Sequence, residues 1–280
     1  MISFGVCAYN EEKSITKAIA SILPQMDKND ELIVVASGCT DKTVETVKSL
    51  KDPRIKIIKQ QKRSGKGAAT NTLLTHIKGN ILIYFDADII VGKQAVSYLL
   101  SHFRSSKTGA VSARIVPYQV RTFFDKVVSF SRNALHLEKL KEQKKGIFWS
   151  LNGYLFALRK GIVKNIDPAN LVEDALLGFL VRQKGYEVVY EPKAIVYEKA
   201  PQSLPDYINQ KTRVRLGWLQ MINKYSMEFC EKRNITHFQY LLKDRFAWPY
   251  LLLEIIIWTK AKIDFRSGRF HWPHVASSKI

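Results

Sequence analysis

Short apolar runs alternate with segments of helical spacing in the first part of the chain. Four apolar runs predict strands, at residues 2–7, 32–35, 54–58 and 81–85. The segments between them predict helices at residues 11–23, after Asp41, and at residues 67–77. The first of these helices would bury a face of four side chains, Ile15, Ala18, Ile19 and Ile22. Fully apolar strands that alternate with helices predict an α/β fold, with a mostly parallel sheet covered on both faces.

Ligands of such sheets bind beyond the carboxyl ends of the strands. This rule selects four loops as candidate binding segments, namely residues 8–12, 36–41, 61–67 and 86–88.

The second half of the chain is less regular. A helix is predicted from the spacing of Phe123, Val127, Phe130, Ala134 and Leu137, with these side chains as its apolar face. Its polar face would be basic, through Lys139, Lys141, Lys144 and Lys145. Further along, we expect extended chain at residues 148–158, a helix at 172–183 and a strand at 187–190. The pattern is helical and basic from Leu204 onward.

Residues 246–258 form a 13-residue apolar stretch interrupted by Pro249 and Glu254. A membrane-spanning helix needs about 20 apolar residues, so this stretch is too short to span a bilayer. It predicts either a core helix or a helix that lies on a membrane surface. Aromatic side chains favour the membrane interface, and a group of them lies here: Trp248, Tyr250, Trp258 and Trp272.

The chain of 280 residues has globular proportions, with 46% hydrophobic and 25% charged residues, which excludes a disordered protein. Its three cysteines form no CxxC pair, and the first residues show no signal peptide, so we expect a cytoplasmic protein. The net charge is +19, of which residues 101–160 and 201–280 together hold +16. Basic excess attracts phosphates, whether in nucleic acid, anionic lipid or nucleotides. Because signatures of nucleic-acid-binding folds are absent, we expect no nucleic-acid partner.

Two acidic pairs are candidates for chemistry. Asp86-Ala87-Asp88 follows a buried strand, and its carboxylates suit a divalent cation such as Mg²⁺ or Mn²⁺ that also binds a diphosphate. The alternative is a strand end with a helix cap at Asp88. Glu173-Asp174 precedes an apolar helical run and could supply a general base. Its alternative is a helix N-terminus, where carboxylates are favoured by the helix dipole.

Two basic segments are candidates for phosphate binding. Arg63-Ser64-Gly65-Lys66-Gly67 is a basic turn before a helix, and it could equally be a plain surface turn. Residues 210–213, with Arg215, form a second basic cluster. The alternative interpretation of this cluster is a helix face exposed to solvent.

Taken in chain order, these segments resemble glycosyltransferase family 2, the inverting nucleotide-sugar transferases with a GT-A fold. The resemblance covers nearly the whole chain. The family's YNEE loop is similar to CAYNEE at residues 7–12, and its EIIVVDDGSTDGT segment is similar to ELIVVASGCTDKT at 31–43. Further similarities are found in KRSGKGAATN at 62–71, the D-x-D motif at 86–88, the acceptor-side segment with Asn152, Gly153, Tyr154, Ala157 and Arg159, the E-D motif at 173–174, and QKTR at 210–213.

The resemblance implies a GT-A domain at residues 1–200 and a helical C-terminal extension at 201–280. The nucleotide site that it implies consists of Ala8, Tyr9, Asn10, Glu11, Ser37, Lys66, Asp86 and Ala87. Asp88, with Asp86, would bind Mn²⁺ or Mg²⁺. Asp174, beside Glu173, would take the proton from the acceptor hydroxyl. The acceptor or the pyrophosphate would be contacted by Asn152, Gly153, Gln210 and Arg213.

Two departures from the family pattern bear on the substrate. Ala36 and Ser37 stand where the family usually has aspartates, so the nucleotide base stays open between uridine, which we favour, and guanosine, and Ser37 or Asp41 could substitute. Val214 stands where the Q-x-x-R-W motif of processive synthases has tryptophan, and no apolar run is long enough to span a membrane. Both features favour transfer of a single sugar.

The expected activity is transfer from a nucleotide-sugar donor to a hydroxyl of a glycan or lipid-linked acceptor. The alternative is a polyprenyl-phosphate hexosyltransferase that uses UDP-glucose or GDP-mannose. A nucleotidyltransferase would need a glycine- and arginine-rich first loop, which residues 8–12 do not provide. The basic blocks also predict an anionic membrane surface as a partner, with the protein peripheral on the cytoplasmic face.

Overall fold

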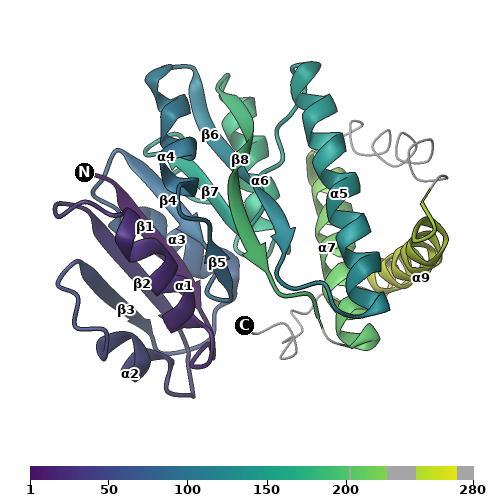
Figure 1. Cartoon of the computed structure of the whole chain (residues 1–280), viewed down its shortest axis with the longest axis horizontal. Coiled ribbons are helices and arrows are strands. Elements are labelled where there is room, and N and C mark those ends of the chain that lie inside the picture. Colours follow the sequence, from purple (N-terminus) through teal and green to yellow (C-terminus); the bar gives the residue numbers. More distant parts are fainter. Residues whose placement is uncertain (202, 226–243, 270–280) are drawn as a thin grey trace.

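The computed structural model describes residues 1–201, 203–225 and 244–269. Within these residues, eight strands form one sheet in the order β3-β2-β1-β4-β7-β6-β8-β5 (Figure 1). The strands are β1 (Ser3–Ala8), β2 (Glu31–Ser37), β3 (Ile55–Gln60), β4 (Ile81–Phe85), β5 (Ile89–Val91), β6 (Thr108–Pro117), β7 (Leu155–Arg159) and β8 (Glu187–Glu198). Neighbours are parallel from β3 to β4 and between β6 and β8, whereas β7 and β5 run antiparallel to their neighbours.

Helices cover both faces of this sheet, as the apolar pattern predicts. The helices are α1 (Ile15–Ile22), α2 (Thr43–Lys48), α3 (Lys66–His76), α4 (Ala95–Ser101), α5 (Phe123–Lys144), α6 (Glu173–Gln183), α7 (Leu204–Tyr225) and α9 (Ala247–Arg266), with 3₁₀ turns η1 (Leu23–Gln25) and η2 (His102–Arg104). Side chains of a strand alternate between faces, so Leu32 and Val34 of β2 pack with α1, while Ile33 and Val35 pack with α3 and α6. The fold is therefore mixed α/β with two buried apolar layers.

The predicted elements of the first half are confirmed, including the buried face of α1 with Ile15, Ala18, Ile19 and Ile22. The apolar pattern did not predict β5, α4 or β6. In β6 the strand pattern is interrupted by Gly109, Ser112 and Arg114, so no apolar run marks it. The strand predicted at residues 187–190 extends to Glu198, and only the last part of 148–158 is a strand.

The apolar face predicted for α5 is confirmed at Val127, which is 2% exposed, but is wrong at Phe123 and Leu137. Phe123 and Leu137 are 64% and 52% exposed, whereas Arg132 and Lys139 are buried. Arg132 forms an ion pair with Glu198, and the Lys139 Nζ lies over the rings of Phe148 and Tyr190. A charged side chain can be buried where such partners offset its loss of water. The inner face of α5 is therefore partly cationic, and Lys139 does not belong to a solvated polar face.

The C-terminal stretch at residues 246–258 begins α9, which packs on α7 and α5 (Figure 1). Ile257 is fully buried with Val128 of α5 and Tyr207 of α7. One side of α9 stays apolar and exposed, with Trp248, Leu252 and Ile255 each more than 60% accessible. In the part of the chain that the structure describes, no helix is long and apolar enough to cross a membrane. Trp272 of the predicted aromatic group lies outside the described residues, and the division at residue 200 stays a prediction.

Helix α6 approaches the preceding loop so closely that only glycine fits at position 178. A Cβ atom there would lie 2.1 Å from the carbonyl oxygen of Trp149 and 3.0 Å from the nitrogen of Leu151. We expect Gly178→Ala to lower the free energy of unfolding by about 1–3 kcal/mol, because backbone atoms must shift to relieve the overlap. Urea denaturation measures this effect. Gln183→Ala, at an exposed site of the same helix, should change the free energy by less than about 0.5 kcal/mol. Equal stability of the two variants would contradict this packing.

Candidate active site

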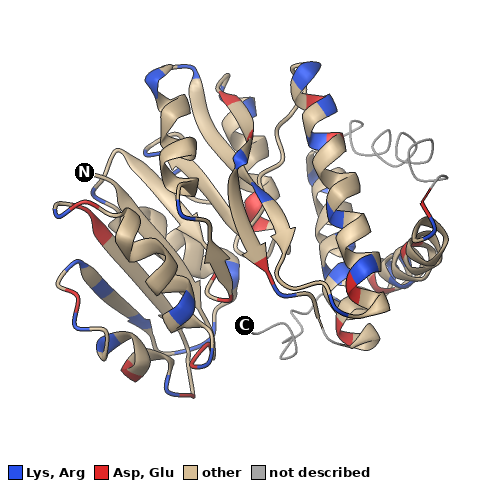
Figure 2. Ribbon diagram, viewed as in Figure 1, with Lys and Arg blue, Asp and Glu red and all other residues tan. Residues whose placement is uncertain are grey.

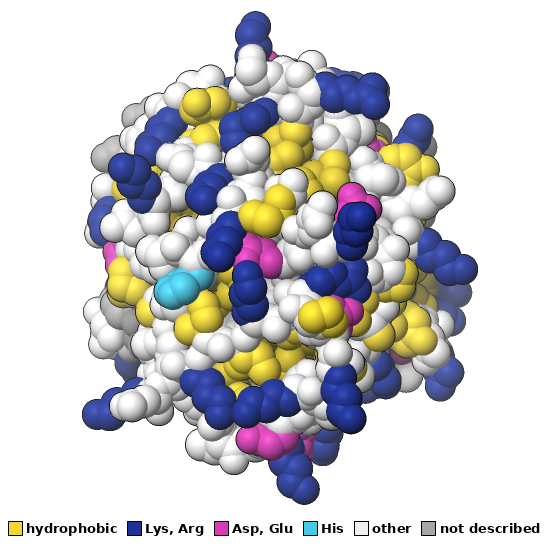
Figure 3. All heavy atoms as spheres, turned by 90° about the vertical axis from the view of Figure 1, so that its left-hand side faces the viewer, with side chains coloured by type: hydrophobic (Ala, Val, Ile, Leu, Met, Phe, Trp, Pro, Cys, Tyr) yellow, Lys and Arg dark blue, Asp and Glu magenta, His cyan; other side chains and the backbone are white. Residues whose placement is uncertain are grey.

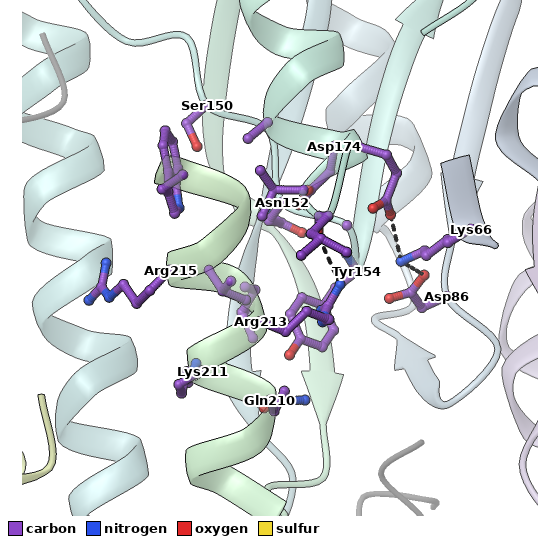
Figure 4. Close-up of a pocket in the computed structure, with 18 of the residues that line it drawn as sticks. Lys66, Asp86, Ser150, Asn152, Tyr154, Asp174, Gln210, Lys211, Arg213 and Arg215 are labelled. Atoms are coloured by element: carbon purple, nitrogen blue, oxygen red, sulfur yellow. Dashed lines mark hydrogen bonds and ion pairs between the residues drawn. The ribbon is translucent and has the colours of Figure 1, made fainter. Parts of the chain in front are cut away.

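A cavity of about 970 Å³ lies at the carboxyl ends of the parallel strands and extends toward α5, α7 and α9 (Figure 4). All four loops that the strand-end rule selects contribute to its wall. The first contributes Tyr9 and Glu11, the second Ser37, the third Arg63 and Lys66, and the fourth residues 86–88. Since these loops end neighbouring strands, the sheet itself brings together segments that are far apart in sequence.

The structure brings most of the predicted site residues to this one cavity. Those that line it are Ala8, Tyr9, Glu11, Ser37, Lys66, Asp86, Ala87, Asp88, Asn152, Gly153, Glu173, Asp174, Gln210 and Arg213. Asn10 is not among the lining residues, and its side chain bonds to Thr40 across the loop instead, at 2.9 and 3.1 Å. Asp41 is also outside the lining, because its carboxylate accepts hydrogen bonds from Thr43 and from the Glu12 nitrogen.

Lys66 is the electrostatic centre of the site. It begins α3, and its Nζ lies 2.8 Å from Asp86 Oδ1 and 2.9 Å from Glu173 Oε1 (Figure 4 shows Lys66 beside Asp86). Burial alone would lower the pKa of Lys66, but Asp86 and Glu173 raise it well above its usual value. Lys66 is therefore a permanent cation that joins the end of β4 to the start of α6.

Asp86 and Asp88 form a carboxylate pair in the turn after β4. Burial raises the pKa of Asp86 to about 6, and Asp88 adds to this rise while Lys66 opposes it. Two carboxylates held close together fit a hard divalent cation, since oxygen atoms are its preferred ligands. Among the described residues, no group of three or more His, Cys, Asp or Glu side chains could hold a metal ion. A cation at Asp86 and Asp88 would therefore take further oxygen ligands from a bound phosphate or from water.

Glu173 and Asp174 open α6 but have different surroundings. Glu173 is buried in the ion pair with Lys66, whereas Asp174 lies beside Gly153. A Cβ atom on Gly153 would come within 3.2 Å of Asp174 Oδ2 and 3.3 Å of Lys66 Nζ, so glycine leaves the space between them open. Burial and then Glu173 raise the pKa of Asp174 to about 6. This carboxylate is mostly ionised at pH 7 and can accept a proton there.

Asn152 supports the loop that carries Gly153. Its amide nitrogen donates to Ser112 Oγ and to the Ala113 carbonyl, and its oxygen accepts from the nitrogens of Tyr154 and Leu155. A side-chain amide has two donors and two acceptor sites, and all four are occupied here. Its hydrogen bonds therefore shape the wall of the cavity.

Arg132 lines the cavity but was not a candidate from the sequence, whereas Arg63 and Lys211 belong to the two basic segments that were. Arg132 binds Glu198 with two nitrogens and donates to the Tyr154 hydroxyl at 3.0 Å, and the Arg63 guanidinium lies 4.1 Å from the centre of the Tyr9 ring. Lys211 lines the cavity from α7. No local sequence signal marks Arg132, because its partner Glu198 is 66 positions away along the chain.

The fold and this strand-end cavity define a GT-A glycosyltransferase. A family model, Glycosyl transferase family 2, matches residues 3–166, and the chain belongs to this family.

Curated relatives include the poly-beta-1,6-N-acetyl-D-glucosamine synthases of two staphylococci. The Staphylococcus aureus (strain COL) enzyme is 24% identical over 222 residues, which cover 77% of this chain and 54% of the relative. The Staphylococcus epidermidis enzyme is 20% identical over 260 residues, covering 90% and 63%. The chain thus spans little more than half the length of the curated relatives it matches.

Solved structures share the fold across most of the chain. The mannosyltransferase PcManGT from Pyrobaculum calidifontis, in complex with GDP-Man and Mn²⁺, has a TM-score of 0.67 and 19% identity, covering 98% of this chain and 76% of its own. Glucosyl-3-phosphoglycerate synthase from Mycobacterium tuberculosis, in complex with Mn²⁺, UDP and phosphoglyceric acid, has a TM-score of 0.56 and 20% identity, covering 79% and 78%. At such identities the likeness establishes the fold.

Removing the charge of Lys66 should destabilise the protein strongly. We expect Lys66→Met to lower the free energy of unfolding by about 3–5 kcal/mol at pH 8, since it leaves Asp86 and Glu173 buried without their cation. The pKa of Asp86 would rise further, and the folded variant would bind a proton that the unfolded chain releases more easily. Stability from that proton is present at low pH and lost as pH rises, so the deficit should shrink at pH 5.

Lys56→Met is the matched control, because Lys56 also pairs with a buried carboxylate, that of Glu31, but is itself half exposed. It should cost less than about 1 kcal/mol. Urea denaturation at both pH values measures the two effects. A cost for Lys66→Met as small as the control's, or one that does not depend on pH, would overturn the assignment of Lys66 as the central cation.

Proposed function

We propose that this chain transfers a single sugar, with inversion, from a nucleotide-sugar to a hydroxyl of a glycan or lipid-linked acceptor. The observation that carries this proposal is the arrangement around Lys66. The carboxylate pair of Asp86 and Asp88 and the candidate base Asp174 line the same cavity, with Lys66 between them. Displacement at an anomeric carbon needs a base on the acceptor side and charge neutralisation on the leaving diphosphate.

The donor would occupy the strand-end loops. Tyr9 with Arg63 over its ring, and Ser37, offer a stacking surface and a hydroxyl for the nucleoside. Asp86 and Asp88 would hold Mn²⁺ or Mg²⁺, which when bound supplies positive charge to the diphosphate. The metal ions and the UDP or GDP-Man in the solved structures with this fold support that assignment. We favour uridine as the base.

Asp174 would act as the general base on the acceptor hydroxyl. A raised pKa of about 6 makes it a stronger base than an ordinary aspartate while leaving it ionised at pH 7. The space beside Gly153 gives a hydroxyl access to its Oδ2. Glu173, which pairs with Lys66, raises the pKa of Asp174 and so would sustain that basicity.

The exposed apolar side of α9 supports contact with an anionic membrane surface, which would suit a lipid-linked acceptor. Lys and Arg are prominent along α5 and α7 (Figure 2), whereas on the face shown in Figure 3 they are scattered among hydrophobic side chains. Helices α7 and α9, which lie within the extension predicted at residues 201–280, would form this surface next to the catalytic domain predicted at residues 1–200. If the acceptor is a polyprenyl phosphate, the reacting oxygen is already ionised and Asp174 matters less.

Nucleoside diphosphates test the donor site. UDP with Mn²⁺ should raise the unfolding temperature, since a ligand at 100 times its Kd stabilises the folded state by about 2.7 kcal/mol. Asp88→Asn should abolish this rise, and the metal alone should not reproduce it. A rise in unfolding temperature with GDP only would indicate that the donor is a guanosine nucleotide-sugar. If neither nucleotide shifts the protein with either metal, the transferase proposal fails.

Asp174→Asn tests the base. With a hydroxyl acceptor, kcat should fall about 10²- to 10⁴-fold while the UDP-dependent thermal shift persists. In the wild type, kcat/KM should decline as pH falls through about 6, because protonated Asp174 cannot accept a proton. Asp167→Asn is a control, since Asp167 pairs with Lys224 at the surface. Retained activity in Asp174→Asn would instead favour the polyprenyl-phosphate alternative.

A further inference from the structure

The cavity has a second end, formed by α5, α7 and α9, that is rich in cations. Cationic side chains of these helices line the cavity, among them Arg132, Lys139, Lys211, Arg215 and Lys262. Figure 4 shows Lys211 and Gln210 on α7, well separated from Lys66 and Asp86 and on the far side of the Tyr154 ring. This end is therefore distinct from the carboxylate end where the donor's diphosphate would bind.

Two of these cations have carboxylate partners of their own. Arg132 forms a two-pronged ion pair with Glu198, with Nη2 2.7 Å from Oε2. Arg215 pairs with Glu254 and also lies 4.8 Å from the centre of the Trp258 ring. Both guanidinium groups are thus fixed in place by neighbouring helices and strands.

Lys211 differs from them. Across the described ranges, the structure records no ion pair or hydrogen bond for its Nζ, which lies 5.4 Å from the centre of the Tyr207 ring. Burial, and then Arg132, lower the pKa of Lys211 to about 7, and Glu198 and Glu254 only partly oppose this effect. A half-buried ammonium without its own carboxylate costs free energy that a bound anion would recover.

The neighbouring Gln210 carries a second unsatisfied group. Its Oε1 is buried and has no hydrogen-bond partner among the described residues. Buried polar atoms are nearly always hydrogen-bonded, so such an atom on a cavity wall indicates a missing ligand or water. A protonated phosphate oxygen or a sugar hydroxyl could donate to it.

We propose that Lys211, with Arg215 one turn further along α7, binds a phosphate group of the acceptor molecule, while Gln210, which points from another side of the helix into the same cavity, contacts another part of that molecule. This inference rests on the proposed function, because the same acceptor must also present its hydroxyl to Asp174 in the shared cavity. A phosphate offers several oxygens, which suits the point charge of a lysine together with the planar fork of an arginine. The chemistry is the same whether the phosphate belongs to a soluble ester or to a lipid headgroup.

Calorimetric titration with glycerol 3-phosphate in EDTA tests the soluble source, because without a divalent cation the carboxylate end is a poor phosphate site. Flotation with vesicles of phosphatidylcholine, with and without phosphatidic acid, tests the lipid source. In the experiment in which the wild-type protein binds its ligand, Lys211→Met should weaken that binding about 10- to 100-fold, the range for a charged hydrogen bond. Lys211→Arg should retain most of it, and Lys224→Met, at an exposed site of the same helix, should change nothing.

Stability measurements separate a binding role from a structural one. Lys211→Met should unfold at the same temperature as the wild type or higher, since it removes a poorly compensated charge. A clear loss of stability would assign Lys211 to the fold and overturn the proposal. So would equal binding by wild type and Lys211→Met, or no binding in either arm by a protein that still binds UDP with Mn²⁺. A protein that binds phosphate through Lys211 but no nucleotide would instead refute the proposed function.

Discussion

One lysine holds together the carboxylates on which this site depends. Lys66 contacts Asp86 at the end of β4 and Glu173 at the start of α6, and its charge also acts on Asp174. Without that cation, the pKa values of Asp86 and Asp174, which burial already raises, would rise further. These contacts also join the end of β4, in the parallel part of the sheet, to the start of α6, which comes after β7 in the chain. The chemistry of the site and the packing of these two parts of the fold therefore depend on the same lysine.

The first half of the fold could be predicted because its signals are local. Strands such as β2 and β4 are continuous apolar runs, and α1 shows its buried face in four side chains of one sequence segment. The position of the cavity follows from topology alone, since parallel strands that begin on one side must end on the other. For that reason residues as distant as Tyr9 and Asp88 could be assigned to one site before their contacts were known.

The features that could not be predicted from the sequence depend on contacts between residues that are far apart along the chain. Arg132 is buried because Glu198, 66 positions away, accepts its hydrogen bonds, and Lys139 because aromatic rings from two other segments lie beneath its ammonium group. A prediction from hydrophobic periodicity treats Arg132 and Lys139 as exposed polar residues. It therefore shifts the expected buried face of α5 around the helix. Asn152 was assigned to the acceptor on motif similarity, yet its amide is fully engaged in the turn. In each case the role of the side chain depends on the residues that it contacts in the folded protein.

The two ends of the cavity have opposite electrostatic imbalances. At the strand ends, the pKa of Asp86 is raised because burial, together with Asp88, outweighs the opposing effect of Lys66. On α7, the pKa of Lys211 is lowered because burial and Arg132 outweigh the nearby glutamates. Each end would be stabilised by a ligand of the opposite sign, a cation with the donor diphosphate at one and an anion at the other. Asp174 lies in the same cavity, so a donor bound at one end and an acceptor bound at the other could bring their reacting atoms together at the base.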